Sequence, residues 1–165
     1  MIMADFKTQV ILALDVESRA KAEHILDTTG SKLKWVKVGL QTYLREGASF
    51  LHDLALTGKE IFLDLKLHDI PNTMVKAIES LSHLPIQMLT IHSTAGPEAL
   101  QKCATAAKEF LPNTKLLAVT VLTSMNQKHL EMRGIPMKNH KFENLSLCHP
   151  ELSWYSQKNY RPPMS

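Results

Sequence analysis

The feature that most restricts the fold of this chain is a regular alternation of short apolar runs with amphipathic segments. Runs rich in Val, Ile and Leu are typical of strands that are buried on both faces of a parallel sheet. The predicted strands cover residues 9–16, 35–40, 60–67, 86–93 and 115–124. Apolar residues at helical spacing fill the segments between them. The predicted helices cover residues 17–30, 42–58, 72–84 and 96–111.

Five strands that alternate with four helices predict an α/β protein with a parallel sheet covered by helices. Both an open doubly wound sheet and a (β/α)₈ barrel fit this order. No G-x-G-x-x-G motif follows the first predicted strand, which weakens the dinucleotide-binding version of the open sheet.

Composition and charge exclude several classes of protein. With 44% apolar and 21% charged residues in 165, the chain is typical of one globular domain. No apolar run approaches the roughly 20 residues of a membrane span. The N-terminus lacks the basic and apolar regions of a secretory signal, so we expect a cytoplasmic protein. The net charge of +3 is scattered and forms no basic stripe with aromatic residues, which argues against nucleic acid as a partner. Cys103 and Cys148 form no motif and predict no disulfide framework.

Polar residues recur near the C-terminal ends of the predicted strands. They are Asp15, Lys37, Asp64, Lys66, His92 and Thr123. In barrels this edge of the sheet carries the chemistry. Each residue alone has an ordinary structural explanation, such as a hydrogen-bonded core histidine at His92 or a helix cap at Thr123. Their repetition over five strands favours a common site.

The stretch FLDLKLHDIPNT, residues 62–73, places charges inside an apolar run. Burying an ion costs several kcal/mol even after relaxation, so these charges need partners. Side chains alternate across a strand, so we expect Asp64 and Lys66 on one face, with Lys37 of the adjacent strand beside Asp64. Asp69 lies beyond the strand, in the loop that leads to Pro71. Alternating Lys and Asp side chains would stabilise one another's charges.

The spacing D-x-K-x-x-D followed by I-P-N-T resembles the signature of the orotidine 5′-phosphate decarboxylase family. Four further segments resemble the family in the same order, from about residue 9 to about residue 135: LALDV, VKVGL, TIHS and AVTVLTS. D-x-K-x-x-D alone is shared with a wider superfamily of sugar-phosphate decarboxylases and aldolases, whereas D-I-P-N-T and T-V-L-T-S are more specific. The resemblance implies a (β/α)₈ barrel, a homodimer with shared active sites, and loss of CO₂ from a pyrimidine nucleotide in UMP biosynthesis. It implies neither a metal nor an organic cofactor.

The resemblance also implies a role for individual residues. Lys66 would protonate the ring carbon, and Asp64 would face the departing carboxylate. Lys37 would bridge the charged residues and the ribose, and Asp15 would bind a ribose hydroxyl. Asp69 would enter the site of the partner subunit. The remaining substrate-binding residues implied are Ile70, Thr73 and Thr123.

The resemblance ends near residue 135. We therefore divide the chain into a barrel part, residues 1–135, and a divergent tail, residues 136–165, with four of the eight prolines and no helical or strand period. The tail is expected to be irregular, and either a disordered tail or a frame-shifted end of a family gene fits it. No strand is predicted after residue 124, so the barrel is expected to be incomplete, with five strands and low activity. Two alternatives remain open: an inactive fragment that associates with itself or with a full-length partner, and a metal-dependent sugar-phosphate lyase of the same superfamily.

Overall fold

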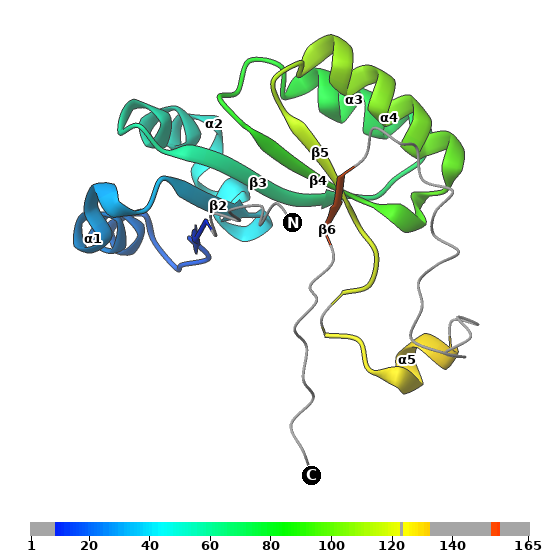
Figure 1. Cartoon of the computed structure of the whole chain (residues 1–165), viewed down its shortest axis with the longest axis horizontal. Helices are drawn as coiled ribbons and strands as arrows, with labels where there is room; N and C mark the ends of the chain where they lie inside the picture. The colour runs from blue at the N-terminus through cyan, green and yellow to red at the C-terminus, as the bar shows by residue number, and fades with distance from the viewer. Residues whose placement is uncertain (1–8, 123, 133–152, 156–165) are drawn as a thin grey trace, which may run out of the picture. The chain divides into compact units, whose positions relative to one another are not determined.

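The computed structural model describes residues 9–122, 124–132 and 153–155 (Figure 1). Its elements are β1 (Ile11–Ala13), α1 (Arg19–Thr29), η1 (Gly30–Lys32), β2 (Trp35–Gly39), α2 (Leu40–Leu56), β3 (Glu60–Leu67), α3 (Pro71–Ser80), β4 (Met88–His92), η2 (Ser93–Ala95), α4 (Pro97–Phe110), β5 (Lys115–Val119), α5 (Gln127–Met132) and β6 (Ser153–Tyr155). The strands have the order β1-β2-β3-β4-β5-β6 in one sheet. The predicted α/β class is therefore confirmed, with each of the five predicted strands and four predicted helices present.

The strand pairs β1–β2, β2–β3 and β5–β6 are parallel. The third of these pairs corrects one prediction, because a strand does follow residue 124. Val119 of β5 is in register with Tyr155 of β6. A strand of three residues is too short to show a period in the sequence, which is why it was not predicted. The other residues of the predicted tail lie outside the described ones. Six strands in the described residues are two fewer than a (β/α)₈ barrel has, so the predicted incomplete barrel still fits.

The chain divides into two compact units, and the first comprises Met1–Leu65 and His83–Leu89. Its described part contains β1, α1, β2, α2 and most of β3. In β3 the four consecutive residues 61–64 are buried, as expected for a strand covered on both faces. Two hydrogen bonds between Gln87 and Ile61 join the segment before β4 to this unit. Gln87 N–H donates to the carbonyl of Ile61, and Ile61 N–H donates to Oε1 of Gln87. The fully buried apolar side chains of this unit include Leu14, Ala22, Val36, Val38, Leu51, Ile61 and Leu63.

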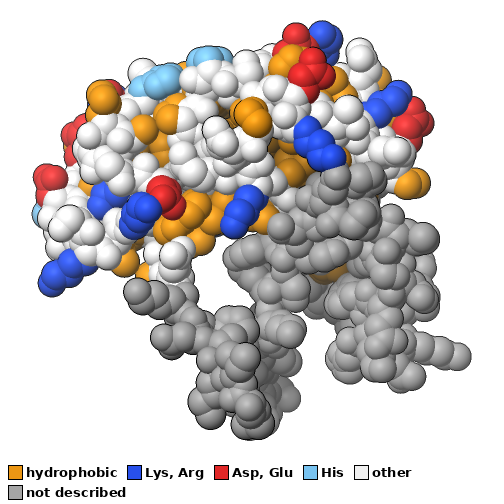
Figure 2. All heavy atoms as spheres, turned by 45° about the horizontal axis from the view of Figure 1, so that its top comes forward, with side chains coloured by type: hydrophobic (Ala, Val, Ile, Leu, Met, Phe, Trp, Pro, Cys, Tyr) orange, Lys and Arg blue, Asp and Glu red, His pale blue; other side chains and the backbone are white. Residues whose placement is uncertain are grey.

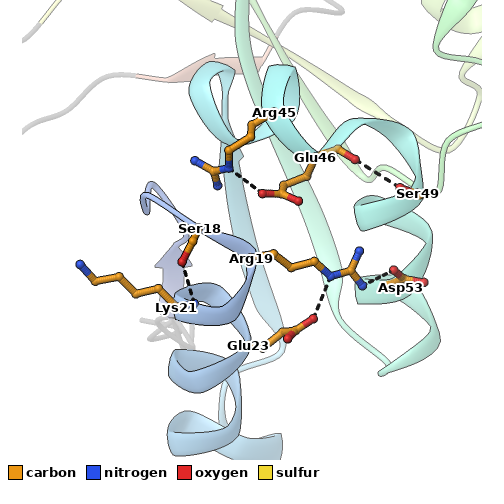
Figure 3. Close-up of polar contacts among 8 residues, drawn as sticks. All are labelled: Ser18, Arg19, Lys21, Glu23, Arg45, Glu46, Ser49 and Asp53. Atoms are coloured by element: carbon orange, nitrogen blue, oxygen red, sulfur yellow. Dashed lines mark hydrogen bonds and ion pairs between the residues drawn. The ribbon is translucent and has the colours of Figure 1, made fainter.

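Polar contacts fix the two helices of the first unit against each other (Figure 3). Ser18 caps α1, since its hydroxyl accepts the N–H of Lys21 at 3.3 Å. Arg19, in the first turn of α1, lies 2.6 Å from Oδ2 of Asp53 on α2 and 2.8 Å from Oε1 of Glu23 on its own helix. These exposed pairs each contribute little to stability, and the Arg19–Asp53 pair is the one of the two that joins α1 to α2.

Helix α2 is interrupted at Gly47, where φ is 71° and ψ is −165°. This backbone conformation is open essentially to glycine alone, because a Cβ would clash with the chain itself. Gly47 therefore separates a first segment of α2, residues 40–46, from a second, residues 48–56. Phe50, Leu51 and Leu54 of the second segment supply the buried core positions.

The second unit comprises Lys66–Ser82 and Thr90–Ser165. Helices α3 and α4 pack side by side in it, as Figure 1 shows in green. Pro71 and Pro97 each begin one of these helices, where the missing N–H has no role. Buried small residues face the core from α4, and one of them is Cys103. Burial raises the pKa of the Cys103 thiol to about 11.

Charged side chains of both signs are spread over the face seen in Figure 2, with apolar side chains between them. This distribution agrees with the small and scattered net charge of the sequence. Within the residues that the structure describes, no helix is long and apolar enough to cross a membrane.

Candidate active site

Three charged residues of the first unit meet beside the sheet: Asp15 follows β1, Lys37 lies within β2 and Asp64 lies within β3. Nζ of Lys37 lies 3.2 Å from Oδ2 of Asp64 and 3.8 Å from Oδ2 of Asp15. Asp64 is only 8% exposed, whereas the side chains of Lys37 and Asp15 are 27% and 47% exposed. The sequence prediction that Lys37 lies beside Asp64 is therefore confirmed. A nearly buried carboxylate held by a cation on the neighbouring strand is the arrangement that burial of charge requires.

The register of the strands produces this meeting. Lys37 is paired with Phe62, and Gly39 is paired with Asp64. Asp64 therefore lies two residues further along the strand direction than Lys37. A lysine side chain is long enough to span that offset. The flexible cation thus reaches forward to the short, fixed carboxylate.

Backbone bonds on both sides hold Asp15 in place after β1. The carbonyl of Leu14 accepts the hydroxyl of Thr42 at 2.8 Å, and the carbonyl of Val16 accepts Nη1 of Arg45 at 2.8 Å. Both donors come from the first segment of α2. In addition, Leu14 N–H donates to the carbonyl of Lys37 at 2.9 Å. The short segment that carries Asp15 is therefore fixed by β2 and α2 together.

Gly39 makes room for the Asp15 carboxylate. An ideal Cβ built on Gly39 would lie 3.1 Å from Cγ of Asp15 and would overlap its Oδ1. The φ of Gly39 is −84°, so the need for glycine comes from this close approach and not from the backbone. The sequence contains Gly39 in the VKVGL segment, but its role depends on a residue 24 positions earlier and could not be read from the spacing.

In the second unit, β3 departs from regular strand geometry at Lys66, which has a φ of 52°. The regular alternation that was used to place Asp64 and Lys66 on one face therefore stops at Leu65. The N–H of Lys66 donates to Oγ1 of Thr90 on β4 at 2.9 Å. Thr90 is 1% exposed and was not among the predicted site residues. A threonine in a buried strand is unremarkable in a sequence, so no signal could have identified it.

Two histidines lie together at the ends of β3 and β4. The rings of His68 and His92 stack with their centroids 5.0 Å apart and their planes 24° apart. Nδ1 of His92 lies 2.6 Å from the hydroxyl of Thr94. His92, a predicted site residue, is thus placed at a strand end as expected. His68 was not predicted, although it lies inside the D-x-K-x-x-D motif.

The predicted residues after β3 lie on the surface of the second unit. Oδ1 of Asp69 accepts the N–H of Ile70 at 2.7 Å, a bond that turns the chain into α3. Asp69 and Thr73 are exposed, and Ile70 is 67% exposed, which is unusual for a large apolar side chain. Thr123, the last predicted site residue, lies outside the described residues.

Among the described residues, no group of three or more His, Cys, Asp or Glu side chains is placed to hold a metal ion. The charged side chains described above can act electrostatically on a substrate. A fixed lysine ammonium stabilises negative charge that develops on a substrate, and a fixed carboxylate disfavours a substrate anion placed against it.

Comparison with known proteins places these residues in a family. The family model described as Orotidine 5'-phosphate decarboxylase / HUMPS family matches residues 8–141. A curated relative from Opitutus terrae, named orotidine 5'-phosphate decarboxylase, is 43% identical over 127 residues, which are 77% of this chain and 55% of the relative. A relative of the same name from Synechocystis sp. is 45% identical over 122 residues, which are 74% of this chain and 52% of the relative. The chain thus spans about half the length of these curated relatives.

Solved structures agree with this result. A crystal structure of orotidine 5'-phosphate decarboxylase from Lactobacillus acidophilus superposes with a TM-score of 0.68 at 32% identity, covering 78% of this chain and 60% of that one. An uncharacterized conserved protein from Geobacillus kaustophilus superposes with a TM-score of 0.70 at 30% identity, covering 78% of this chain and 61% of that one. The family model alone covers well over half of the residues, so the chain belongs to the Orotidine 5'-phosphate decarboxylase / HUMPS family.

Proposed function

We propose that this chain supplies the charged catalytic residues of an orotidine 5′-phosphate decarboxylase. This enzyme converts orotidine 5′-phosphate to uridine 5′-phosphate and CO₂ in cytoplasmic pyrimidine biosynthesis. The observation that carries the proposal is the nearly buried Asp64 held by Lys37, in a chain whose curated relatives carry that name at 43% and 45% identity. The reaction needs groups of this kind, because its substrate loses an anion and develops a carbanion.

The chemistry follows from the charges. Asp64, fixed by Lys37, is placed against the substrate carboxylate and raises the free energy of the bound substrate through like-charge repulsion. The bond from the ring carbon to the carboxylate breaks, CO₂ departs, and the electron pair stays on the ring carbon. The ammonium of Lys66 then gives its proton to that carbon and is left as a neutral amine, which solvent protonates again. A cation that is already in place needs no solvent reorganisation during this step.

The other residues bind and complete the site. Asp15 is held in place by the hydrogen bonds that the carbonyls of Leu14 and Val16 accept. Its carboxylate accepts a hydrogen bond from a ribose hydroxyl. Ile70 and Thr73 line the site beside Asp69, and Asp69 enters the site of a second subunit. Exposure of Asp69 and Ile70 supports this role, since both are available to a partner chain. Thr123 contacts the substrate from the segment after β5. No cofactor takes part in the reaction.

The test is an absorbance assay of orotidine 5′-phosphate loss with the purified chain, alone and mixed with the C-terminal part of the Opitutus terrae relative. We expect negligible turnover by the chain alone, because it spans 55% of that relative, and measurable turnover by the mixture. Lys66→Ala should abolish the turnover. Lys76→Ala is the matched control, since Lys76 is an exposed lysine of the same unit that pairs with Glu79. It should leave the rate unchanged.

The same assay separates the alternatives. Activity that EDTA removes would favour a metal-dependent sugar-phosphate lyase, and turnover that survives Lys66→Ala would refute the assigned proton donor. Substantial turnover by the chain alone would show that no further segment is needed. A mixture that forms a complex but remains inactive would favour a fragment whose role is association.

A further inference from the structure

Lys66 has the one positive φ, 52°, found at a residue other than glycine in the part of the chain that the structure describes. A residue with a Cβ seldom adopts this left-handed conformation, because the Cβ approaches the backbone too closely. Such strained residues persist where the surroundings hold them, and they cluster at functional sites. Something in the second unit must therefore hold the backbone of Lys66.

Thr90 supplies one contact to this backbone. Its Oγ1 accepts the N–H of Lys66 at 2.9 Å, across 24 residues of sequence. Thr90 is 1% exposed, so water has little access to compete for this bond. It lies within β4 between the fully buried Leu89 and Ile91, so its backbone belongs to a buried strand. The acceptor is thus a side chain on a rigid strand.

We propose that Thr90 is a positioning residue for Lys66. By accepting the Lys66 N–H, its hydroxyl keeps the backbone in the left-handed conformation and so turns the lysine side chain away from the direction that strand alternation would give it. The inference rests on the proposed role of Lys66 as proton donor. Thr90 itself contacts no substrate. A displacement of about 1 Å in a catalytic group can slow a reaction about 100-fold, so the fixed direction matters for the rate.

The first test is structural and needs no activity. In NMR spectra of the full chain, we expect the Cα and Cβ shifts of Lys66 to be those of a left-handed residue, with its amide protected from exchange. Thr90→Val keeps the shape of the side chain but removes the acceptor, so the Lys66 amide should exchange about tenfold faster, the factor for one ordinary hydrogen bond. Thr90→Ser keeps the hydroxyl and should retain the protection. Extended-strand shifts at Lys66 in the unmodified chain would overturn the inference even if Thr90→Val does not fold.

The second test is kinetic and uses the active mixture described above. Thr90→Val should lower kcat about 100-fold, while KM changes by less than about threefold, since substrate binding is left intact. Thr90→Ser should restore most of kcat. Ile78→Val is the matched control, because Ile78 is fully buried on α3 of the same unit and has no contact with the Lys66 amide among those described. An equal loss of kcat in Ile78→Val and Thr90→Val would show a general loss of stability and refute positioning. If no mixture decarboxylates the substrate, the proposed function fails, and the NMR result still decides the role of Thr90.

Discussion

Replacing Lys37 by Met tests how much the buried ion pair stabilises the first unit. The Lys37–Asp64 contact is 3.2 Å long and its carboxylate is 8% exposed, so we treat it as one charge-assisted hydrogen bond. Such a bond contributes about 1.5–3 kcal/mol to the free energy of unfolding. The longer contact with the half-exposed Asp15 adds little. Lys37→Met should therefore lower Tm by about 3–12 °C for a chain of this size.

The assays are thermal unfolding for Tm and urea unfolding for the free energy, both followed by circular dichroism, with Lys34→Met as the matched control. Lys34 pairs with Glu60, but its side chain is 65% exposed, so the same substitution there should change stability by about 0–1 kcal/mol. Adding Asp64→Asn to Lys37→Met should cost less than the sum of the single changes, because the pair is already broken. A Lys37→Met chain as stable as Lys34→Met, or more stable than the unmodified chain, would refute a stabilising pair. The Lys37–Asp64 pair would then contribute nothing to the free energy of unfolding, and its role would be in the chemistry alone.

Three further outcomes are expected. Gly39→Ala should displace the Asp15 carboxylate and weaken the binding of uridine 5′-phosphate about 10- to 150-fold, measured by calorimetry with the active mixture, and unchanged affinity would contradict the close approach. The folded-state pKa of Cys103, about 11, lies above the ordinary thiol value, so this group's stabilising contribution is complete below pH 8 and is lost as pH rises toward 11. Alkylation at pH 8.5, followed by mass spectrometry of the Cys103 peptide, should be slow until urea unfolds the chain. Mixed dimers of Asp69→Ala and Lys66→Ala chains, completed by the C-terminal part, should regain activity that neither parent has, and verified mixed dimers without activity would place Asp69 in the site of its own chain.

The sequence predicted strand β3 with the bounds that the structure shows, Glu60–Leu67. It also predicted the partner of Asp64, because a buried carboxylate in an apolar run needs a cation and Lys37 was available on the neighbouring strand. Apolar runs overestimated the other four strands, and two of them by five residues each. The run from residue 9 to 16 forms a strand only over Ile11–Ala13, since the chain leaves the sheet before Asp15. The run from 115 to 124 ends as a strand at Val119.

What the sequence could not predict depends on contacts between distant residues. The left-handed backbone at Lys66 contradicts the preference of lysine itself and is held by Thr90, which comes 24 residues later. The requirement for glycine at position 39 comes from the place of Asp15, not from any turn at Gly39. The periodicity and spacing of residues describe each segment alone, so they predict neither the backbone of Lys66 nor the need for glycine at position 39.

The interruption of α2 at Gly47 has a consequence for how substitutions in this helix act. The first segment carries Thr42 and Arg45, whose bonds fix the backbone around Asp15, while the second carries core residues such as Phe50. Because the helix is interrupted at Gly47, we expect substitutions at the exposed Arg45 to change the backbone around Asp15 more than the packing of Phe50. We therefore expect ligand affinity and stability to respond to substitutions in separate stretches of one helix, as long as residue 47 is glycine.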